Sequence, residues 1–322
     1  MNVLITGGAG FIGSNLVGHL LQMPEVSFVR VLDNLATGFE KNISEFAGHP
    51  RFEFMQGDIR RYDDCLAACA GIDAVSHQAA LGSVPRSIND PLTSNEVNVT
   101  GSLNVLTAAK EAGIRRVVFA ASSSTYGDHP GLPKVEDKIG KPLSPYAVTK
   151  YVNELYAQVY ARTYGLEYIG LRYFNVFGPK QDPNGAYAAV IPLFIKAILD
   201  NEPPRINGDG ETSRDFTYID NVVDANTKAL FTTNPQAVNQ VYNVAFGEQT
   251  TLNGLFETLK QIAGSDLAAQ YVPERPGDVR HSLADISKAK SLLGYDPRVS
   301  VRDGLKVAFD WYRQCHNYSY SV

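Results

Sequence analysis

The chain has 322 residues, of which 44% are apolar, and this suits one large α/β domain or two domains in close contact. Its formal net charge of −5 and isoelectric point near 5.7 argue against nucleic acid as a partner. Three cysteines are too few for a disulfide framework, and we expect Cys65 and Cys69 to be small buried residues on one helix face.

The N-terminal segment "MNVLIT" is typical of a strand, without the basic and apolar regions of a secretion signal. We therefore expect a soluble cytoplasmic protein that does not enter a membrane. No metal-binding set is predicted.

Short apolar runs alternate with helical patterns through the first half of the chain. Strands are predicted at 2–6, 27–33, 52–56, 73–78, 115–122 and 167–174, and helices at 11–22, 62–70, 92–112 and 144–164. This alternation is typical of a parallel sheet covered by helices on both faces.

After Asn175 the pattern loosens. Short strands are expected near 205–207, 214–218 and 241–244, and helices near 190–200, 219–231, 252–263, 285–293 and 301–314. We expect an α/β, Rossmann-type doubly wound parallel sheet at 1–176, with a return near 215–245. Residues 177–214 and 246–322 would form a smaller mixed α/β lobe that binds substrate, and the interface between the two is a usual place for a ligand cleft.

A strand, a glycine turn and a helix follow one another in "NVLITGGAGFIGSNLVGHLL". Gly7, Gly10 and Gly13 let the chain turn tightly and let a pyrophosphate approach the backbone at the helix N-terminus. Asp33 closes the second strand, twenty residues after Gly13, where a carboxylate binds adenosine ribose hydroxyls and repels a 2′-phosphate. These features predict a dinucleotide site that prefers NAD to NADP. Asp58, after the third strand, is a candidate partner for the adenine amino group.

A tyrosine and a lysine stand four residues apart in "LSPYAVTK". Ser144 is a predicted N-cap and Pro145 a first helical residue, so Tyr146 and Lys150 share one helix face. A phenol has a pKa of about 10, and a nearby ammonium lowers it by stabilising the phenolate. A hydroxyl from the serine-rich end of the fifth strand, "AASSSTYGD", would help to hold the reacting oxygen.

The chain resembles an extended short-chain dehydrogenase/reductase of the nucleotide-sugar epimerase and dehydratase branch. The matching segments run nearly end to end: "TGGAGFIG", "LDNL", "GDIR", "HQAA", "NVTGSLNVL", "SSSTYGD", "SPYAVTK", "LRYFNVFGP", "GDGETSRDFTYIDNV" and "RPGDVRHSLADISKA". The resemblance implies that Tyr146 is the base, that Lys150 activates it and anchors the nicotinamide ribose, and that Ser122 is the hydroxyl partner. The NAD site that it implies consists of Gly7, Gly10, Phe11, Ile12, Gly13, Asp33, Asn34, Gly38, Asp58, Ile59, Gln78, Ala79, Ala80, Tyr146, Lys150, Tyr173 and Val176.

Two serines follow the catalytic hydroxyl where the related 4,6-dehydratases have an Asp and a Glu. Ser123 and Ser124 lack the acid–base capacity of those carboxylates, so elimination is disfavoured. The chemistry left is epimerisation: C4 of the sugar is oxidised to a ketone with NAD, the intermediate rotates, and the hydride returns to the other face.

Further positions resemble the UDP-N-acetylglucosamine 4-epimerases. Relatives that act on plain hexoses often have a lysine at the position of Gly82 and can have a tyrosine at that of Ser282, whereas small residues leave room for a 2-acetamido group. Because such volume differences give only about 1–3 kcal/mol of discrimination, we expect some activity on UDP-glucose and UDP-galactose.

A diphosphate requires local positive charges, because the chain as a whole is acidic. The family resemblance assigns this task to Arg214 and Arg275. Asn175 is expected to face cofactor and diphosphate, and Asp278 to hold a ribose or an arginine. The predicted substrate site consists of Gly82, Ser83, Ser123, Ser124, Asn175, Gln181, Ala189, Val190, Asn207, Arg214, Arg275, Asp278 and Ser282.

Two alternatives remain open. A UDP-hexuronate or UDP-N-acetylhexosaminuronate 4-epimerase needs one more cationic contact, for which Arg86 and Arg280 are candidates. A non-catalytic NAD-binding regulator is disfavoured because the Ser, Tyr and Lys set is intact. We expect a structural role for His77 rather than proton transfer, and a homodimer formed through the helices near 92–112 and 144–164.

Overall fold

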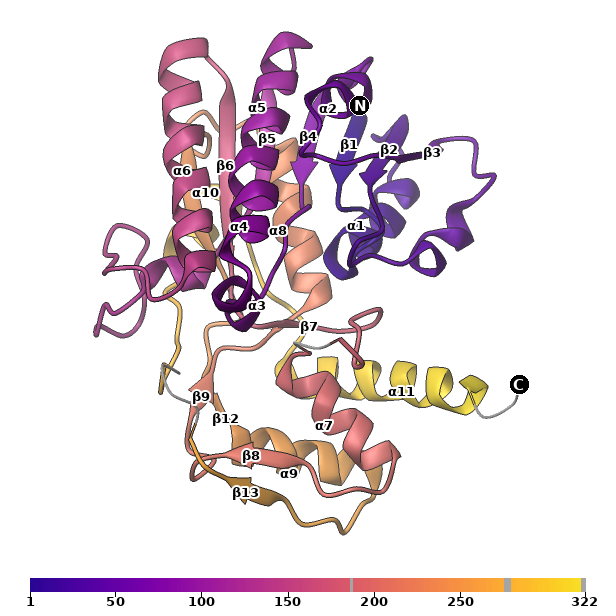
Figure 1. Cartoon of the computed structure of the whole chain (residues 1–322), viewed down its shortest axis with the longest axis vertical. Coiled ribbons are helices and arrows are strands. Elements are labelled where there is room, and N and C mark those ends of the chain that lie inside the picture. The colour runs from indigo at the N-terminus through magenta and orange to yellow at the C-terminus, as the bar shows by residue number, and fades with distance from the viewer. Residues whose placement is uncertain (186–187, 275–278, 320–322) are drawn as a thin grey trace.

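Seven parallel strands form the central sheet in the spatial order β11-β6-β5-β4-β1-β2-β3 (Figure 1). The computed structural model describes residues 1–185, 188–274 and 279–319, the last three as backbone only. The strands are β1 Asn2–Thr6, β2 Phe28–Asp33, β3 Phe52–Gln56, β4 Ala74–His77, β5 Arg116–Ser122, β6 Glu167–Tyr173 and β11 Gln240–Val244. The order reverses between β1 and β4, so ligands are expected beyond the carboxyl ends of these strands. The predicted Rossmann-type fold is confirmed.

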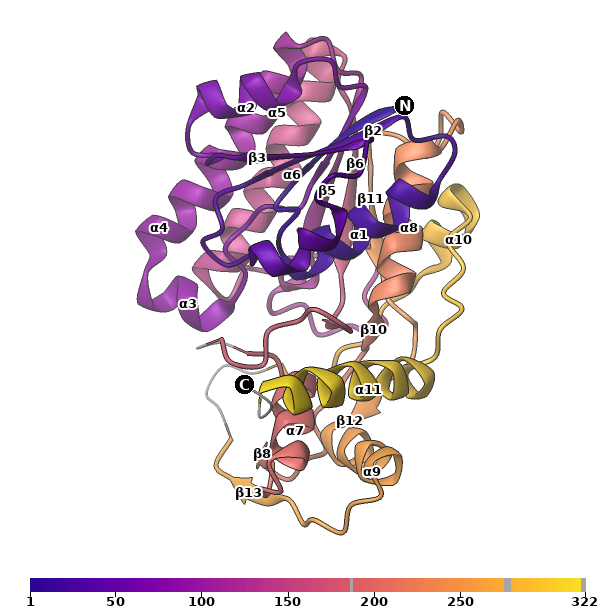
Figure 2. The same ribbon diagram turned by 90° about the vertical axis from the view of Figure 1, so that its right-hand side faces the viewer.

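Helices cover both faces of this sheet (Figure 2). On one face lie α2 Tyr62–Cys69, α5 Ser102–Glu111 and α6 Pro145–Tyr164, and on the other α1 Phe11–Gln22, α8 Ile219–Phe231 and α10 Ser287–Leu293. Side chains alternate along β1 accordingly, since Leu4 packs in the cluster of α2 and α5 while Val3 and Ile5 pack against α1. Both faces therefore contribute apolar core.

The predicted helix at 92–112 is divided into three pieces, and a short helix precedes it. These are α3 Val84–Asn89, α4 Pro91–Asn95, a π-helical segment at Glu96–Gly101 and α5. Asp90 separates the first two because its carboxylate caps α4 by accepting from the N–H of Thr93 at 3.0 Å, and Pro91 follows as the first helical residue. The sequence periodicity did not reveal α3, which has only six residues.

The second part of the chain adds short strands and three longer helices below the carboxyl ends of the main sheet (Figures 1 and 2). They are α7 Val190–Leu199, α9 Leu252–Ala263 and α11 Val301–Ser319, with the strand pairs β8 Arg205–Asn207 and β13 Gln270–Val272, and β9 Ser213–Arg214 and β12 Thr250–Thr251. The predicted strand at 214–218 is in fact β9 and β10 Thr217–Tyr218. β10 pairs with β7 Val176–Phe177.

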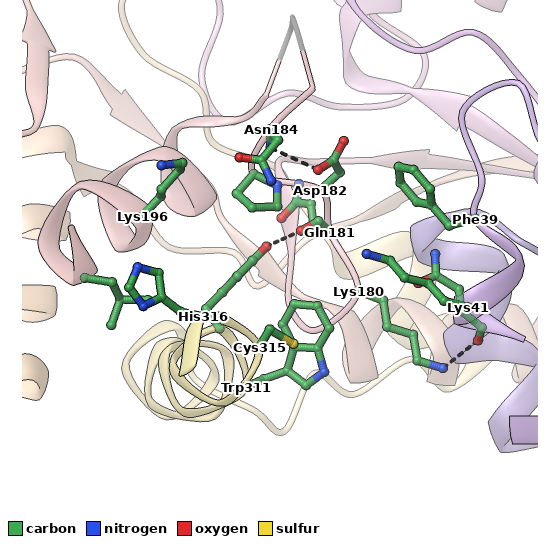
Figure 3. A pocket seen from close by; sticks show the side chains of 14 residues that line it. Phe39, Lys41, Lys180, Gln181, Asp182, Asn184, Lys196, Trp311, Cys315 and His316 are labelled. Carbon is green, nitrogen blue, oxygen red and sulfur yellow. Dashed lines mark hydrogen bonds between the residues drawn. The ribbon is translucent and has the colours of Figure 1, made fainter. Parts of the chain in front are cut away.

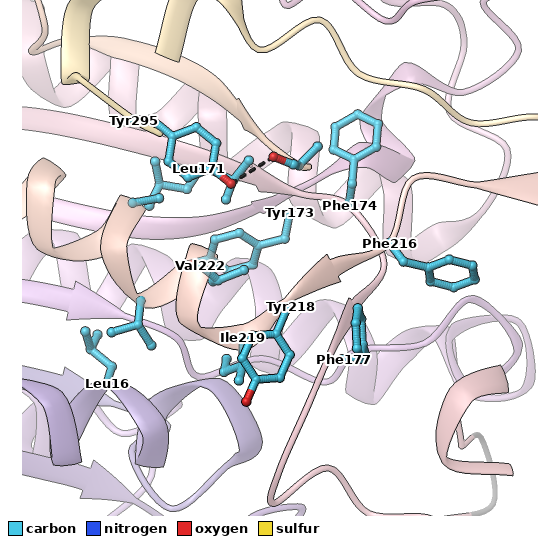
Figure 4. Close-up of a cluster of buried hydrophobic side chains, with 14 of the residues drawn as sticks. Leu16, Leu171, Tyr173, Phe174, Phe177, Phe216, Tyr218, Ile219, Val222 and Tyr295 are labelled. Atoms are coloured by element: carbon cyan, nitrogen blue, oxygen red, sulfur yellow. Dashed lines mark hydrogen bonds between the residues drawn. The ribbon is translucent and has the colours of Figure 1, made fainter. Parts of the chain in front are cut away.

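Aromatic side chains fill the region where β6 leads into this second part (Figure 4). The ring of Phe177 meets those of Phe216 and Tyr218 at centroid distances of 6.5 and 5.6 Å. Tyr295 donates its hydroxyl to the carbonyl of Ala245 at 2.8 Å. The segment after β6 is thus held by packing on both sides.

A buried ion pair fixes α6 to the sheet. Arg172 in β6 donates two hydrogen bonds to the Glu154 carboxylate in α6, at 2.9 and 2.7 Å, and the two residues are 3% and 1% exposed. Such a two-bond contact between guanidinium and carboxylate has a defined geometry. It holds α6, the helix that carries Tyr146 and Lys150, in register with β6.

Cys65 and Cys69 are both buried in the core between α2 and α5, as expected. Burial raises the pKa of the Cys65 thiol to about 12 and that of Cys69 to about 11, so both are packed as thiols. Of the helices in the described ranges, none combines the length and hydropathy that a bilayer span requires.

Candidate active site

The glycine turn lies between β1 and α1, at the point where the strand order reverses. A Cβ on Gly13 would stand 2.2 Å from the Gly7 carbonyl oxygen, and one on Gly7, whose φ is +71°, would stand 2.6 Å from the Ala79 nitrogen. Only glycine fits either position. α1 starts at Gly10 with no side-chain cap, so its first N–H groups are available to an anion.

A cavity of about 410 Å³ opens above this turn. Most of the predicted NAD residues line it: Gly7, Gly10, Phe11, Ile12, Gly13, Asp33, Asn34, Gly38, Asp58, Ile59, Gln78, Ala79 and Ala80, together with Gly82, which was predicted for the substrate. Arg60, Thr93 and Val97 also line it and were not predicted. Arg60 had a signal in the sequence, because it stands two residues after Asp58.

Two carboxylates at the cavity differ in environment. Asp33 is 8% exposed and accepts from the N–H groups of Ala9 and Leu35 at 2.9 and 2.8 Å. Burial raises its pKa, and these two hydrogen bonds act in the opposite direction. Asp58 binds Arg60 and accepts from Asn34 at 2.9 Å, and the hydrogen bond from Arg60 is the main reason that the pKa of Asp58 falls to about 2. Asp58 is therefore anionic at neutral pH.

Tyr146, Lys150 and Ser122 come together at the carboxyl end of β5. Lys150 is 4% exposed, donates to the Ala120 carbonyl at 2.8 Å, and has its nitrogen 5.9 Å from the centroid of the Tyr146 ring. Burial lowers the pKa of Lys150 to about 8. The pKa of Tyr146 is raised, because burial outweighs the opposing effect of the hydrogen bond with the Ser122 side chain, whereas the sequence led us to expect that the nearby ammonium would lower it. Ser122, at the serine-rich strand end, thus contacts the side chain of Tyr146.

The third of the three serines contacts the first. Ser122 Oγ accepts from the backbone N–H of Ser124 at 3.2 Å and from its hydroxyl at 2.9 Å. Ser123 begins a short 3₁₀ helix, Ser123–Tyr126, that brings Ser124 back over the strand end. Ser124 thus fixes the Ser122 hydroxyl, although the sequence predicted a contact of Ser124 with substrate.

His77 is held from both ring nitrogens. Nδ1 lies 2.6 Å from Thr6 Oγ1 and Nε2 lies 2.9 Å from Ser102 Oγ. Burial and then the charge of Lys150 lower the pKa of His77 to about 3, so the ring is neutral at physiological pH. This arrangement agrees with the structural role expected for His77.

A second cavity of about 260 Å³ contains five of the eleven predicted substrate residues that the structure describes. It is lined by Asn175, Val176, Ala189, Val190, Asn207 and Arg214, along with Phe177, Ile191, Thr212, Phe216 and Leu252. Val176 had been predicted for NAD instead. Residues 173–176 connect the two cavities. The Tyr173 hydroxyl donates to Oε1 of Gln78, which lines the first cavity, at 3.0 Å, and Asn175 and Val176 line the second.

Other predicted substrate residues lie elsewhere. Gln181 lines a separate cavity of about 420 Å³ beside α7 and α11, where its carbonyl accepts from Tyr312 (Figure 3). Ser282 is not among the lining residues, but its N–H donates to the Ser213 carbonyl at 3.1 Å, next to Arg214. Ser83 follows Gly82 with φ +117°. Arg275 and Asp278 lie outside the described residues.

The two arginines considered for a sugar carboxylate have different surroundings. Arg280 forms an ion pair with Asp209 at 3.1 Å, and both side chains are more than half exposed. Arg86 belongs to α3, and its backbone N–H donates to the Ser83 side chain at 3.3 Å. Arg280 is therefore already engaged at the surface.

Comparisons with known proteins agree with this arrangement. A model of the NAD dependent epimerase/dehydratase family matches residues 3–245. The solved structure of the UDP-N-acetylglucosamine 4-epimerase from Methanobrevibacter ruminantium M1, in complex with UDP-N-acetylmuramic acid, is 41% identical and has a TM-score of 0.92, with 98% of each chain covered.

Two curated relatives are similar over nearly their whole length. The UDP-glucose 4-epimerase of Mycolicibacterium smegmatis is 36% identical over 97% of this chain and 99% of its own. The UDP-glucuronate 4-epimerase of Thermodesulfobacterium geofontis is 35% identical over 97% of this chain and 96% of its own. The glycine turn, the cavity above it and these similarities lead to one conclusion: the chain belongs to the NAD dependent epimerase/dehydratase family, and its cofactor is NAD.

Proposed function

We propose that this protein inverts C4 of a UDP-sugar, most readily between UDP-GlcNAc and UDP-GalNAc, through a 4-keto intermediate. The observation that carries the proposal is the meeting of Ser122, Tyr146 and Lys150 at the end of β5. The cavity at the glycine turn suits a dinucleotide, and the one lined by Asn175 and Arg214 suits a nucleotide sugar. A non-catalytic regulator would not need this set, so enzymatic activity is favoured.

The residues of the set have complementary tasks in the proposed reaction. Tyr146, as phenolate, takes the proton of the C4 hydroxyl and later returns it to the carbonyl oxygen. Lys150 stabilises the phenolate by its charge, and Ser122 binds Tyr146 and the reacting oxygen. When bound beside these residues, NAD would supply a reversible hydride acceptor for C4 of the sugar.

Epimerisation is favoured over dehydration because Ser123 and Ser124 have no carboxylate. Elimination across C5 and C6 needs a base and an acid at the sugar, and hydroxyl groups are poor in both roles at neutral pH. Ser124 is also engaged with Ser122. The residues beside the reacting carbon thus serve a hydride exchange.

The choice of an acetylated sugar rests on small residues. A Cβ on Gly82 would meet nothing within 4 Å, so this position leaves free space at the cofactor cavity. Ser282 is small and lies next to the strand that carries Arg214. The 41% identity to a protein named as a UDP-N-acetylglucosamine 4-epimerase supports the same choice.

The test is a substrate panel of UDP-GlcNAc, UDP-Glc and their C6-oxidised forms, with product separated by chromatography. We expect the highest kcat/KM with UDP-GlcNAc and a lower value, by about 10- to 200-fold, with UDP-Glc. Preference for the uronates would instead favour the alternative that the glucuronate 4-epimerase relative suggests. Tyr146→Phe should abolish turnover on every sugar while NAD stays bound.

A matched pair of variants tests the proposed sugar wall. Ser282→Tyr should lower kcat/KM for UDP-GlcNAc and leave that for UDP-Glc nearly unchanged, because only the acetamido group needs the space. Ser291→Tyr, on the exposed part of α10, is the control and should change neither value. An equal loss on both sugars after Ser282→Tyr would count against the assignment of this wall.

A homodimer is part of the proposal. Val148, Leu155 and Val159 stand seven and eleven residues apart on α6, form one stripe, and are 42–48% exposed. Leu92, on α4, is 82% exposed. Apolar side chains gathered on these helices support pairing through them. We also propose that residues 1–176, with a return near 215–245, bind NAD, that 177–214 and 246–322 bind the sugar nucleotide, and that the protein is cytoplasmic.

A further inference from the structure

A fully buried serine outside the predicted site contacts the catalytic helix. Ser87, in α3, is 0% exposed. Its Oγ accepts from the backbone N–H of Tyr146 at 3.0 Å and donates to the Val84 carbonyl, three residues earlier in its own helix, at 2.8 Å. Both hydrogen-bonding roles of the hydroxyl are thus filled, and one of its partners is the backbone of the proposed base.

The N–H of Tyr146 has no partner within its own helix start. Ser144 is the N-cap of α6, and its side chain accepts from Ala147 at 3.1 Å while its carbonyl accepts from Val148 at 3.1 Å. Pro145 has no N–H. The backbone N–H of Tyr146 is therefore the donor in this first turn that needs an acceptor outside the helix, and Ser87 Oγ is that acceptor.

The short helix that carries Ser87 is continuous with a segment of the cofactor cavity. Gly82 lines that cavity, and the Ser83 carbonyl accepts from the Ser87 N–H at 3.2 Å. Ser83 caps α3 by accepting from Arg86, in a backbone conformation with φ +117° that residues other than glycine seldom adopt. One turn of helix thus joins the cavity wall at Gly82 to the backbone of Tyr146.

We propose that Ser87 is a positioning residue for the epimerase reaction: by accepting the Tyr146 N–H, it sets where the phenol stands relative to Lys150 and Ser122. This inference rests on the role proposed for Tyr146. Ser87 itself touches no reacting atom. Its effect comes through geometry, and small displacements of a reacting group have large kinetic effects.

The primary test is Ser87→Ala, assayed as the NAD-loaded enzyme over a range of pH values. Without its acceptor, the start of α6 is free to shift, and we expect kcat to fall by about 10- to 100-fold while KM changes less than threefold. Because a displaced phenol loses part of its contact with the Lys150 charge, the acidic limb of the kcat profile should move to higher pH. NAD content per chain should stay the same.

Two further variants separate positioning from simple destabilisation. Ser94 lies in α4, is 1% exposed, and has a hydroxyl without a hydrogen-bond partner in the described part of the chain. Ser94→Ala therefore removes a buried serine hydroxyl, as Ser87→Ala does, but breaks no hydrogen bond. It should leave kcat and its pH profile unchanged. Ser87→Thr retains the hydroxyl, and threonine in a helix can also bond the carbonyl three residues earlier, so we expect it to restore most of kcat.

The outcomes are distinguishable. If Ser87→Ala keeps kcat within twofold of the wild type with an unshifted pH profile, or if Ser94→Ala loses as much activity, the positioning role is wrong. If Ser87→Ala is too unstable to assay, the pH profile of Ser87→Thr replaces it as the test. Because this variant keeps the hydroxyl, an acidic limb that is lost or shifted would contradict the proposal. Full activity of Tyr146→Phe would instead overturn the catalytic assignment on which the proposal rests.

Discussion

Lys150 is the charged residue whose surroundings matter most to the proposed chemistry. It is buried beside Tyr146, and burial lowers its pKa to about 8 from an ordinary value of 10.5. Below pH 8 its ammonium is present and, in the proposed mechanism, would stabilise the Tyr146 phenolate. Above pH 8 the proton is lost, and that stabilisation is lost with it.

This gives a prediction about pH. The kcat of the wild-type enzyme should decline as the pH rises through about 8, since the active form needs protonated Lys150. Lys150→Arg keeps its charge to far higher pH, so its kcat, although smaller, should show no decline between pH 8 and 10. An alkaline limb that is identical in both enzymes would assign it to another group.

At the level of single residues, the sequence was most informative where chemistry demands one residue type at a fixed spacing. This reason made it possible to predict the glycines of the turn, Asp33 and the Tyr146–Lys150 pair. In the structure the glycines and Asp33 line one cavity, and Lys150 lies beside the Tyr146 ring. Ser87 could not be predicted, because its contact with Tyr146 joins two separate elements. Arg60, two residues after Asp58, and the contact between Ser124 and Ser122 are local and were missed. Gln181 matched a family segment, yet it lines a different cavity, and its side-chain amide donates to the Val176 carbonyl at 3.2 Å.

At the level of elements, the turn from β1 into α1 depends on close contact between backbones. Gly13→Ala would put a Cβ 2.2 Å from the Gly7 carbonyl oxygen and displace the start of α1 from the turn. We expect NAD affinity to fall by about 5- to 150-fold, as overpacking of about 1–3 kcal/mol implies. Nucleotide released on denaturation, measured per chain, reports this.

The control is Gly254→Ala in α9, where the nearest atom to an added Cβ is a threonine side chain at 3.3 Å. It should retain wild-type NAD content. Equal occupancy in Gly13→Ala and Gly254→Ala would contradict the account of the turn.

The contact between β6 and α6 predicts a stability effect. Arg172→Met leaves the buried Glu154 carboxylate without its partner, and we expect the free energy of unfolding to fall by about 3–5 kcal/mol. Arg172→Met combined with Glu154→Gln removes the uncompensated charge and should recover part of this loss. Urea denaturation measures both, and a double variant no more stable than the single one contradicts the explanation.

The elements were predicted well where their periodicity is long and regular, as in α1, α6 and the strands of the main sheet. The division of the segment at 92–112 into α4, a π-helical segment and α5 was missed because the three helical pieces follow one another without a loop. The short strands β7, β10 and β12 have two residues each, and tertiary contacts rather than local sequence determine them.

At the level of the whole molecule, pairing through α6 has a direct test. Leu155→Lys with Val159→Lys places two charges in the exposed apolar stripe, and we expect the mass in solution to fall from twice the 35.2 kDa of one chain to that of one chain. Leu193→Lys, on α7 and 41% exposed, is the control and should remain dimeric. Light scattering after size-exclusion chromatography gives the masses, and a wild type that is already monomeric contradicts the proposed dimer.

The proposed reaction requires a hydride that leaves C4 of the sugar and returns to the same carbon. The most direct test uses UDP-GlcNAc with deuterium at C4, converted by the enzyme in ordinary water and analysed by NMR. We predict UDP-GalNAc that keeps its deuterium at C4, now on the opposite face. Product that carries hydrogen from solvent at C4, or a dehydrated sugar in place of the inverted one, would contradict the account.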